Sequence, residues 1–363
     1  MKSLRMIMLV LCAAINCIAQ SLPAKLIPPN GKYPIGTVVY EWADETRDLA
    51  ITNNIGDRRT VIVQIWYPAM TDSNSVPAPY SALSADYRNI ETNGFLRPSF
   101  AKDLSPSKLI LIVPGRGTER FLYTTIAEEL ASRGFTVASI DMPEIGYTIY
   151  QDGLILKPSK EFETPPGMMA GPYEKVDAFF EKPTAIGYMD LKFALDRIRA
   201  LNENDPDKRF TGRIDLLNIG IFGHSLGGRI AGEFAARNTN VKALAAMEGI
   251  APRDVRYNGK ISVPQLMLCS SGTLPYAVDN YMSLVDNRKN IVYMAELVDF
   301  GHNSVTDNPY LFPGKYKYRI DPQKGLEISR RLLANFFDAY LRHDGDFQKA
   351  DLVSETVKIT KYN

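Results

Sequence analysis

The segment 223–227, which reads Gly-His-Ser-Leu-Gly, constrains the fold of this chain more than any other stretch. The apolar run 219–222 precedes it, and the helix-like stretch 228–237 follows it. This order predicts a buried strand, a sharp turn and a helix, in which the two glycines let the strand and the helix approach closely. Such a turn exposes the serine hydroxyl at the end of a sheet, so Ser225 is the candidate nucleophile.

Apolar runs and amphipathic stretches alternate along the rest of the chain. The runs interpreted as strands lie at 37–42, 60–67, 109–113, 135–140, 241–247, 265–269 and 291–297. The stretches interpreted as helices lie at 121–133, 184–201, 228–237 and 326–341, the last of which is expected to close the chain. This alternation predicts an α/β fold with a mainly parallel central sheet and helices on both faces. The first two strands flank a polar turn region and predict an antiparallel N-terminal edge.

Two long segments separate predicted core elements. Segment 68–107 is dense in Pro, Ser, Asn and Asp, which predicts a surface excursion with one short helix. Segment 142–183 carries Pro-Pro-Gly and six aromatic residues, so it is interpreted as a lid-like insertion or pocket wall, with an ordinary decorated loop as the alternative. Apart from this insertion, residues 20–363 are predicted to form a single catalytic domain.

Residues 1–19 have the pattern of a cleaved secretory signal peptide. Two basic residues among the first five precede the apolar run 6–15, and small residues lead to a cleavage site near Ala19. A buried first helix is one alternative, and lipidation of Cys17 is another, although Asn16 stands where a small residue is expected. No apolar run reaches the roughly 18 residues of a membrane span. The mature protein is therefore expected to be secreted or periplasmic, without a transmembrane segment.

Charge and cysteine content narrow the classes of function. The 363 residues include 42 Lys and Arg against 41 Asp and Glu, a net charge of +1 without a long run of one sign, which argues against nucleic-acid partners. Cleavage of the signal would leave Cys269 as the one cysteine, so no internal disulfide is expected. The three histidines have no metal-ligand spacing, and neither a metal nor an organic cofactor is expected.

A serine nucleophile needs a general base, and the chain has only three histidines that could serve as one. His224 is adjacent to the serine and is interpreted as structural, while His343 ends the last predicted helix and is interpreted as a surface cation. His302 follows the strand at 291–297, in a loop that could bring its ring to the carboxyl edge of the sheet. His302 is therefore the candidate base.

The acid that orients this base has two candidates between the serine and the histidine. Glu248 directly follows the strand after the one that carries Ser225, so its carboxylate is expected at the same sheet edge. Asp279 follows the next strand, where the acid is commoner in folds of this kind, but it lies ten residues beyond Cys269, after a loose loop. Glu248 is favoured as the acid, and Asp279 remains the alternative.

Ester or amide cleavage also needs hydrogen-bond donors for the developing oxyanion. The backbone N–H of Leu226, directly after the serine, is one candidate, and the backbone N–H of Arg116, in the Gly-Arg-Gly loop after the strand at 109–113, is the other. A dinucleotide-binding loop is a rival interpretation of Gly-x-Gly, but Arg120 occupies its third glycine position.

Six segments resemble the α/β-hydrolase superfamily, and within it the platelet-activating-factor acetylhydrolase (plasma, isoform II) group and its bacterial esterase relatives. They are 63–68, 111–117, 130–135, 190–196, 221–228 and 301–304. The resemblance implies an α/β-hydrolase fold and an acid at the position of Glu248, where that family has an aspartate. It also implies an oxyanion loop at Pro114-Gly115, where the family usually has His-Gly.

Residues and resemblance together predict an exported serine carboxylic-ester hydrolase that acts through Ser225, His302 and Glu248 and an acyl-enzyme. The resemblance implies short-acyl substrates, acetylated phospholipid-like esters among them. A cutinase-like polyester hydrolase and a serine peptidase on the same fold share these motifs and stay open. A non-catalytic binding protein of this fold is expected to lack a triad member, whereas all three are present here.

Overall fold

The computed structural model of the chain describes residues 25–49, 57–81, 87, 89–104, 106–170, 173–271, 274–348 and 352–363, and at 170 and 274–279 it describes the backbone alone. The predicted signal peptide 1–19, with Cys17, lies outside the described residues, as does the side chain of Asp279. Within the described ranges, no helix combines the length and the apolar character that crossing a membrane requires.

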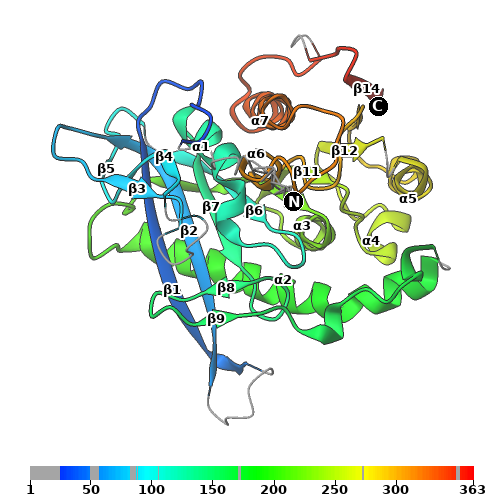
Figure 1. Ribbon diagram of the computed structural model, residues 1–363, viewed down its shortest axis with the longest axis horizontal. Coiled ribbons are helices and arrows are strands. Elements are labelled where there is room, and N and C mark those ends of the chain that lie inside the picture. The colour runs from blue at the N-terminus through cyan, green and yellow to red at the C-terminus, as the bar shows by residue number, and fades with distance from the viewer. Residues whose placement is uncertain are drawn as a thin grey trace, which may run out of the picture.

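One large sheet organises the described part of the chain (Figure 1). In spatial order its strands are β14 (Val357–Tyr362), β13 (Val292–Leu297), β12 (Gln265–Ser270), β11 (Val241–Met247), β10 (Ile214–His224), β6 (Ser107–Val113), β7 (Thr136–Asp141), β2 (Arg58–Met70), β1 (Ile35–Asp48), β4 (Glu91–Leu96) and β3 (Pro77–Pro79), with β5 (Ser99–Phe100) paired to β2. Neighbouring strands from β7 across to β13 are parallel. The predicted α/β fold with a mainly parallel sheet is confirmed.

Helices cover both faces of this sheet, as Figure 1 shows for α2 on one side and α1 and α7 on the other. The helices are α1 (Thr124–Ser132), α2 (Tyr173–Glu203), α3 (Leu226–Arg237), α4 (Arg253–Tyr257), α5 (Leu274–Asp286), α6 (Asn308–Leu311) and α7 (Pro322–Phe337). Shorter elements are η1 (Arg120–Tyr123), η2 (Lys160–Phe162), η3 (Met168–Ala170), η4 (Asp338–Arg342) and the hairpin of β8 (Thr148–Ile149) and β9 (Ile155–Leu156).

Alternating side chains of β6 show how the core is divided. Leu109 and Leu111 are fully buried in the apolar cluster that contains Ile230 of α3. Ile110 and Ile112 are fully buried in a second cluster, with Ile126 of α1. Successive side chains of a strand point to opposite faces, so an uninterrupted apolar run is what a strand covered on both faces requires.

Both edges of the sheet differ from the expectation. The pair β1 and β2 is antiparallel as predicted, but it is not the edge, because β4 and β3 extend the sheet beyond β1. These two strands come from segment 68–107, which was interpreted as a surface excursion. At the other edge β14 pairs antiparallel with β13, so the helix predicted at 326–341 does not close the chain. Edge strands have one pairing partner and a weak sequence pattern, because much of their surface faces water.

The helix predicted at 184–201 starts eleven residues early, at Tyr173, within the predicted insertion 142–183. Pro183 lies inside this helix, whereas a proline usually marks a helix boundary. The Thr184 hydroxyl donates to the Phe180 carbonyl over 2.5 Å, which gives one backbone acceptor near the proline a partner. Arg229 of α3 donates to Asp177 in the first turns of α2. Tertiary contacts of this kind offset the local cost of the proline.

Candidate active site

The turn between β10 and α3 holds Ser225 in an unusual backbone conformation. Its φ of 56° and ψ of −125° fall where residues with a side chain are uncommon. A Cβ atom on Gly227 would lie 2.0 Å from the Val113 carbonyl oxygen, and one on Gly223 would lie 2.3 Å from the Gly227 carbonyl oxygen. Both positions therefore need glycine for strand and helix to pass so closely. Strain of this kind concentrates at functional sites.

His302 and Glu248 are joined by a hydrogen bond between Nδ1 of the ring and Oε2 of the carboxylate. Glu248 directly follows β11 with φ 51°, and its side chain is 4% exposed. The other carboxylate oxygen, Oε1, accepts from the backbone N–H of Ser270 over 2.9 Å and from the Ser270 hydroxyl. When Nδ1 of a neutral imidazole donates, Nε2 carries the free lone pair and can accept a proton.

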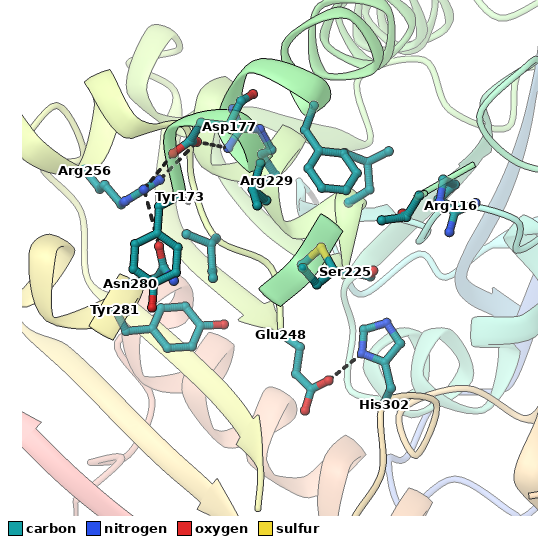
Figure 2. A pocket seen from close by; sticks show the side chains of 16 residues that line it. Arg116, Tyr173, Asp177, Ser225, Arg229, Glu248, Arg256, Asn280, Tyr281 and His302 are labelled. Carbon is teal, nitrogen blue, oxygen red and sulfur yellow. Dashed lines mark hydrogen bonds and ion pairs between the residues drawn. The ribbon is translucent and has the colours of Figure 1, made fainter. Parts of the chain in front are cut away.

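A cavity of about 300 Å³ brings the sequence-predicted residues together. Ser225, Leu226, Glu248, His302 and Arg116 all line it, and Figure 2 shows the dashed contact from Glu248 to the His302 ring below Ser225. The four segments that supply these side chains follow β6, β10, β11 and β13. Carboxyl ends of parallel strands meet at one sheet edge, which is the physical reason for the convergence.

The loop after β6 lies directly against the serine. A Cβ on Gly115 would be 3.3 Å from Cβ of Ser225. The loop is held by hydrogen bonds from the Gly117 N–H to the Ile145 carbonyl, 2.9 Å, and from the Gly115 N–H to the hydroxyl of Tyr123, 3.0 Å. In the part of the chain that the structure describes, no atom accepts a hydrogen bond from the backbone N–H of Arg116. Leu226 is the first residue of α3, so its N–H has no acceptor within the helix.

His224 connects this loop to the segment that carries the candidate base. Its ring is 1% exposed, with Nε2 lying 2.8 Å from the His302 carbonyl oxygen and Nδ1 2.8 Å from the Tyr123 hydroxyl. A carbonyl can only accept, so Nε2 donates, and in the neutral ring Nδ1 accepts from Tyr123. Burial lowers the pKa of His224 to about 3, which keeps the ring neutral. The structural role expected for His224 therefore includes a backbone contact at His302 that the sequence did not indicate.

Replacing His224 by leucine is expected to lower the free energy of unfolding by about 1–3 kcal/mol at pH 7.5, because the His302 carbonyl and the Tyr123 hydroxyl lose a partner. His224→Gln keeps an N–H donor and should lose less. The pKa of His224 is lowered from 6.5 to about 3, so the unfolded chain binds a proton that the folded chain does not. The stability advantage of wild type over His224→Gln should therefore be full above pH 6.5 and shrink toward pH 3. Urea unfolding of both proteins at several pH values measures this difference in the free energy of unfolding. A difference that does not change with pH would contradict the prediction.

The predicted insertion 142–183 supplies one wall of the cavity. Its lining residues are Thr164, Met169, Tyr173, Val176, Asp177 and Phe180. Asp177 forms ion pairs with Arg229 of α3 at 2.5 Å and with Arg256 of α4 at 2.8 Å. Sequence reasoning missed this cluster because its members are separated by 52 and 27 residues along the chain.

The remaining candidates lie outside the cavity. The Cys269 thiol is buried in β12, and burial raises its pKa, which suits inert packing. His343 is exposed directly after η4, with φ 55°. Among the residues described, no group of three or more His, Cys, Asp or Glu side chains is arranged to hold a metal ion.

Comparison with known proteins identifies a shared fold. No protein-family model matches the chain, and no curated protein matches it. Among solved structures, a ferulic acid esterase from Streptomyces cinnamoneus superposes with a TM-score of 0.77 at 22% sequence identity, over 93% of this chain and 99% of that one. At this identity the likeness establishes the fold alone.

Proposed function

We propose that this protein is a serine carboxylic-ester hydrolase of the α/β-hydrolase fold, with Ser225 as nucleophile, His302 as base and Glu248 as acid. The observation that carries the proposal is the hydrogen bond from His302 Nδ1 to Glu248, at the cavity that Ser225 also lines. A neutral imidazole oriented by a buried carboxylate beside a strained serine is the arrangement that activates a hydroxyl.

The proposed reaction gives each of these groups one role. Ser225 Oγ attacks the ester carbonyl while His302 Nε2 takes its proton, and Glu248 stabilises the imidazolium that forms. The N–H groups of Leu226 and Arg116 donate to the carbonyl oxygen as it gains charge. The C–O bond to the alcohol then breaks, and the proton on His302 passes to the leaving oxygen. Water attacks the acyl-enzyme, its proton passes through His302 to Ser225 Oγ, and the acid leaves.

The fold supports this assignment. The sheet order β1-β2-β7-β6-β10-β11-β12-β13 places the serine turn in the middle of the parallel strands, where an exposed nucleophile elbow is expected. The ferulic acid esterase that shares the fold covers nearly the whole chain and is an ester hydrolase by name. We therefore favour ester over peptide substrates.

Short-acyl esters are the substrate class we propose, with acetylated phospholipid-like esters included because of the resemblance of the sequence segments. A cavity of about 300 Å³ is at the lower end of the range for small-molecule sites, which supports a small acyl group. We propose that one catalytic domain spans 20–363, and that the protein is exported. The proposal of export rests on the sequence of residues 1–19 alone.

Hydrolysis of the 4-nitrophenyl esters of acetate, butyrate and octanoate tests the proposal. We expect turnover of acetate and butyrate and at least about a tenfold lower kcat/KM for octanoate, because a longer chain exceeds the cavity. Release of 4-nitrophenolate by the purified protein measures it. Absence of turnover on all three esters would remove ester hydrolysis as the function, and a rising kcat/KM with chain length would remove the short-acyl assignment.

A further inference from the structure

Among the described residues, the guanidinium of Arg116 is a group of the candidate active site that has no partner. The Arg116 side chain is half-buried and lines the same cavity as Ser225 (Figure 2). In the described part of the chain, no carboxylate, carbonyl or hydroxyl forms a hydrogen bond or an ion pair with this guanidinium. A half-buried guanidinium without such a partner is available to pair with an anionic group of a bound ligand.

The loop that carries Arg116 is rigid. Gly117 has φ 72°, and its N–H is bound to the Ile145 carbonyl. Thr118 closes the turn with two contacts to the Gly115 carbonyl, from its N–H at 3.2 Å and from its hydroxyl at 2.7 Å. The guanidinium is therefore attached to a fixed backbone next to the nucleophile, and binding a ligand there requires ordering of the side chain alone.

A second positive feature lies elsewhere in the same cavity. Asp177 is placed between Arg229 and Arg256, both less than 9% exposed, so this cluster has a net charge of +1. Burial alone would raise the pKa of Asp177, but hydrogen bonds from the two guanidinium groups lower it, and the carboxylate stays ionised. Nε of Arg256 is buried and has no hydrogen-bond partner among the described residues.

The charges that line the cavity therefore do not cancel. Three guanidinium groups, those of Arg116, Arg229 and Arg256, face two carboxylates, those of Asp177 and Glu248. Glu248 is occupied by His302 and Ser270, and Asp177 by its two arginines. The net charge of these five groups is +1, and Arg116 is the one cation of this set that pairs with no carboxylate of the described residues. A positive cavity raises the local concentration of anionic substrates.

We infer that the cavity selects esters carrying an anionic group, a carboxylate or a phosphate, which pairs with the Arg116 guanidinium while the ester carbonyl lies at Ser225. The inference rests on the proposed ester hydrolysis and deepens it by naming the substrate class. A guanidinium binds either anion through two parallel N–H···O hydrogen bonds, which a lysine does not reproduce.

Matched pairs of esters test the inference on the full chain. The acyl pair is 4-nitrophenyl hydrogen adipate and its methyl ester, so the two substrates differ by one carboxylate. The alcohol pair is 4-acetoxybenzoate and its methyl ester, and 4-acetoxyphenyl phosphate replaces the carboxylate by a phosphate. The measured quantity is the ratio of kcat/KM for the anionic ester to kcat/KM for its neutral partner, after subtraction of the rate with Ser225→Ala.

We expect the wild-type ratio to exceed about 10 in at least one pair, and Arg116→Gln to lower that ratio by about 10- to 100-fold, the worth of a hydrogen bond to a charged group. Arg116→Lys should retain part of the preference. Arg199→Gln removes a positive charge from a residue of α2 that lies outside the cavity and has a side chain 42% exposed, and it should leave the ratio unchanged. The pair that shows the preference identifies where the anion sits, and comparison of benzoate with phosphate identifies which anion binds better.

A wild-type ratio at or below one in every pair would overturn the inference, as would an unchanged ratio in Arg116→Gln. Turnover of the neutral esters in the same assays keeps the two proposals separate, because it establishes ester hydrolysis whatever the ratio. If Arg116→Gln does not fold, the salt dependence of kcat/KM of the wild type tests the inference instead. Raising the salt from 0.05 to 0.5 M should lower kcat/KM for the anionic ester and spare the neutral one, since screening shortens the range of the charge.

Discussion

Replacing Ser225 by alanine is expected to lower kcat for 4-nitrophenyl butyrate by at least about 10⁴-fold, because the acyl-enzyme can no longer form. The remaining rate comes from the oxyanion donors and substrate binding, which do not need the hydroxyl. Alanine keeps the Cβ atom at a position with φ 56°, so the turn between β10 and α3 should persist. Initial rates of 4-nitrophenolate release, with thermal unfolding as a check on folding, measure the effect.

Ser262→Ala is the matched control, because this serine is exposed and lies outside the cavity. Its kcat should equal that of the wild type. Retention of more than about a tenth of the wild-type rate by a folded Ser225→Ala protein would remove the serine mechanism. Stoichiometric labelling of wild type, and not of Ser225→Ala, by an organophosphonate would locate the nucleophile independently of turnover.

Replacing Glu248 by glutamine is expected to lower kcat by about 10²- to 10⁴-fold, with KM changed little. The amide has nearly the shape of the carboxylate, but it has no charge to stabilise the imidazolium, and its NH₂ group opposes the N–H of His302 Nδ1. Glu248→Asp withdraws the carboxylate by one methylene and should lose less. His302→Ala should lose as much as Ser225→Ala, and the double variant no more, because residues that act in one step are not additive.

Asp279→Asn is the control for the choice of acid, and it is expected to retain near-wild-type kcat. Loss of turnover in Asp279→Asn together with retention in Glu248→Gln would reverse the assignment. The activity of Glu248→Gln reports on the role of the acid only if this variant folds, and the contacts with Ser270 indicate that it does. The N–H and hydroxyl of Ser270 both donate to Oε1 of Glu248, so a glutamine there still has an acceptor for them and should fold.

Local pattern was enough for the central elements. The apolar run at 109–113 predicted β6 because a strand buried on both faces has no polar alternation. Glycines at 223 and 227 predicted the turn because no other residue fits the approach of β10 and α3. Glu248 and His302 were expected at one sheet edge because both follow the carboxyl end of a parallel strand, Glu248 directly and His302 after a short loop, and the structure joins them by a hydrogen bond. Their catalytic roles stay predictions.

Contacts between segments far apart in the chain could not be predicted from local sequence pattern. Strands β3, β4 and β14 form only because the sheet offers a partner, since their own patterns are short and polar. Helix α2 passes through Pro183, and its first turns contact α3 and α4 through Asp177. The expectation that a proline ends a helix considers only the backbone hydrogen bond that the proline removes. It does not include the tertiary contacts that stabilise the helix in spite of that loss.

The sequence by itself determined the alternation of strands and helices in the core, the turn that exposes Ser225 and the sheet edge at which His302 and Glu248 meet. Those features depend on the period of apolar residues and on glycines at close approaches, and both are local properties of a chain. Only the tertiary structure decided that the His224 ring hydrogen-bonds the backbone carbonyl of His302, and that Arg116 lines the cavity without a partner among the described residues. Hydrogen bonds and charge balance are properties of residues that folding brings together, so no stretch of sequence contains them.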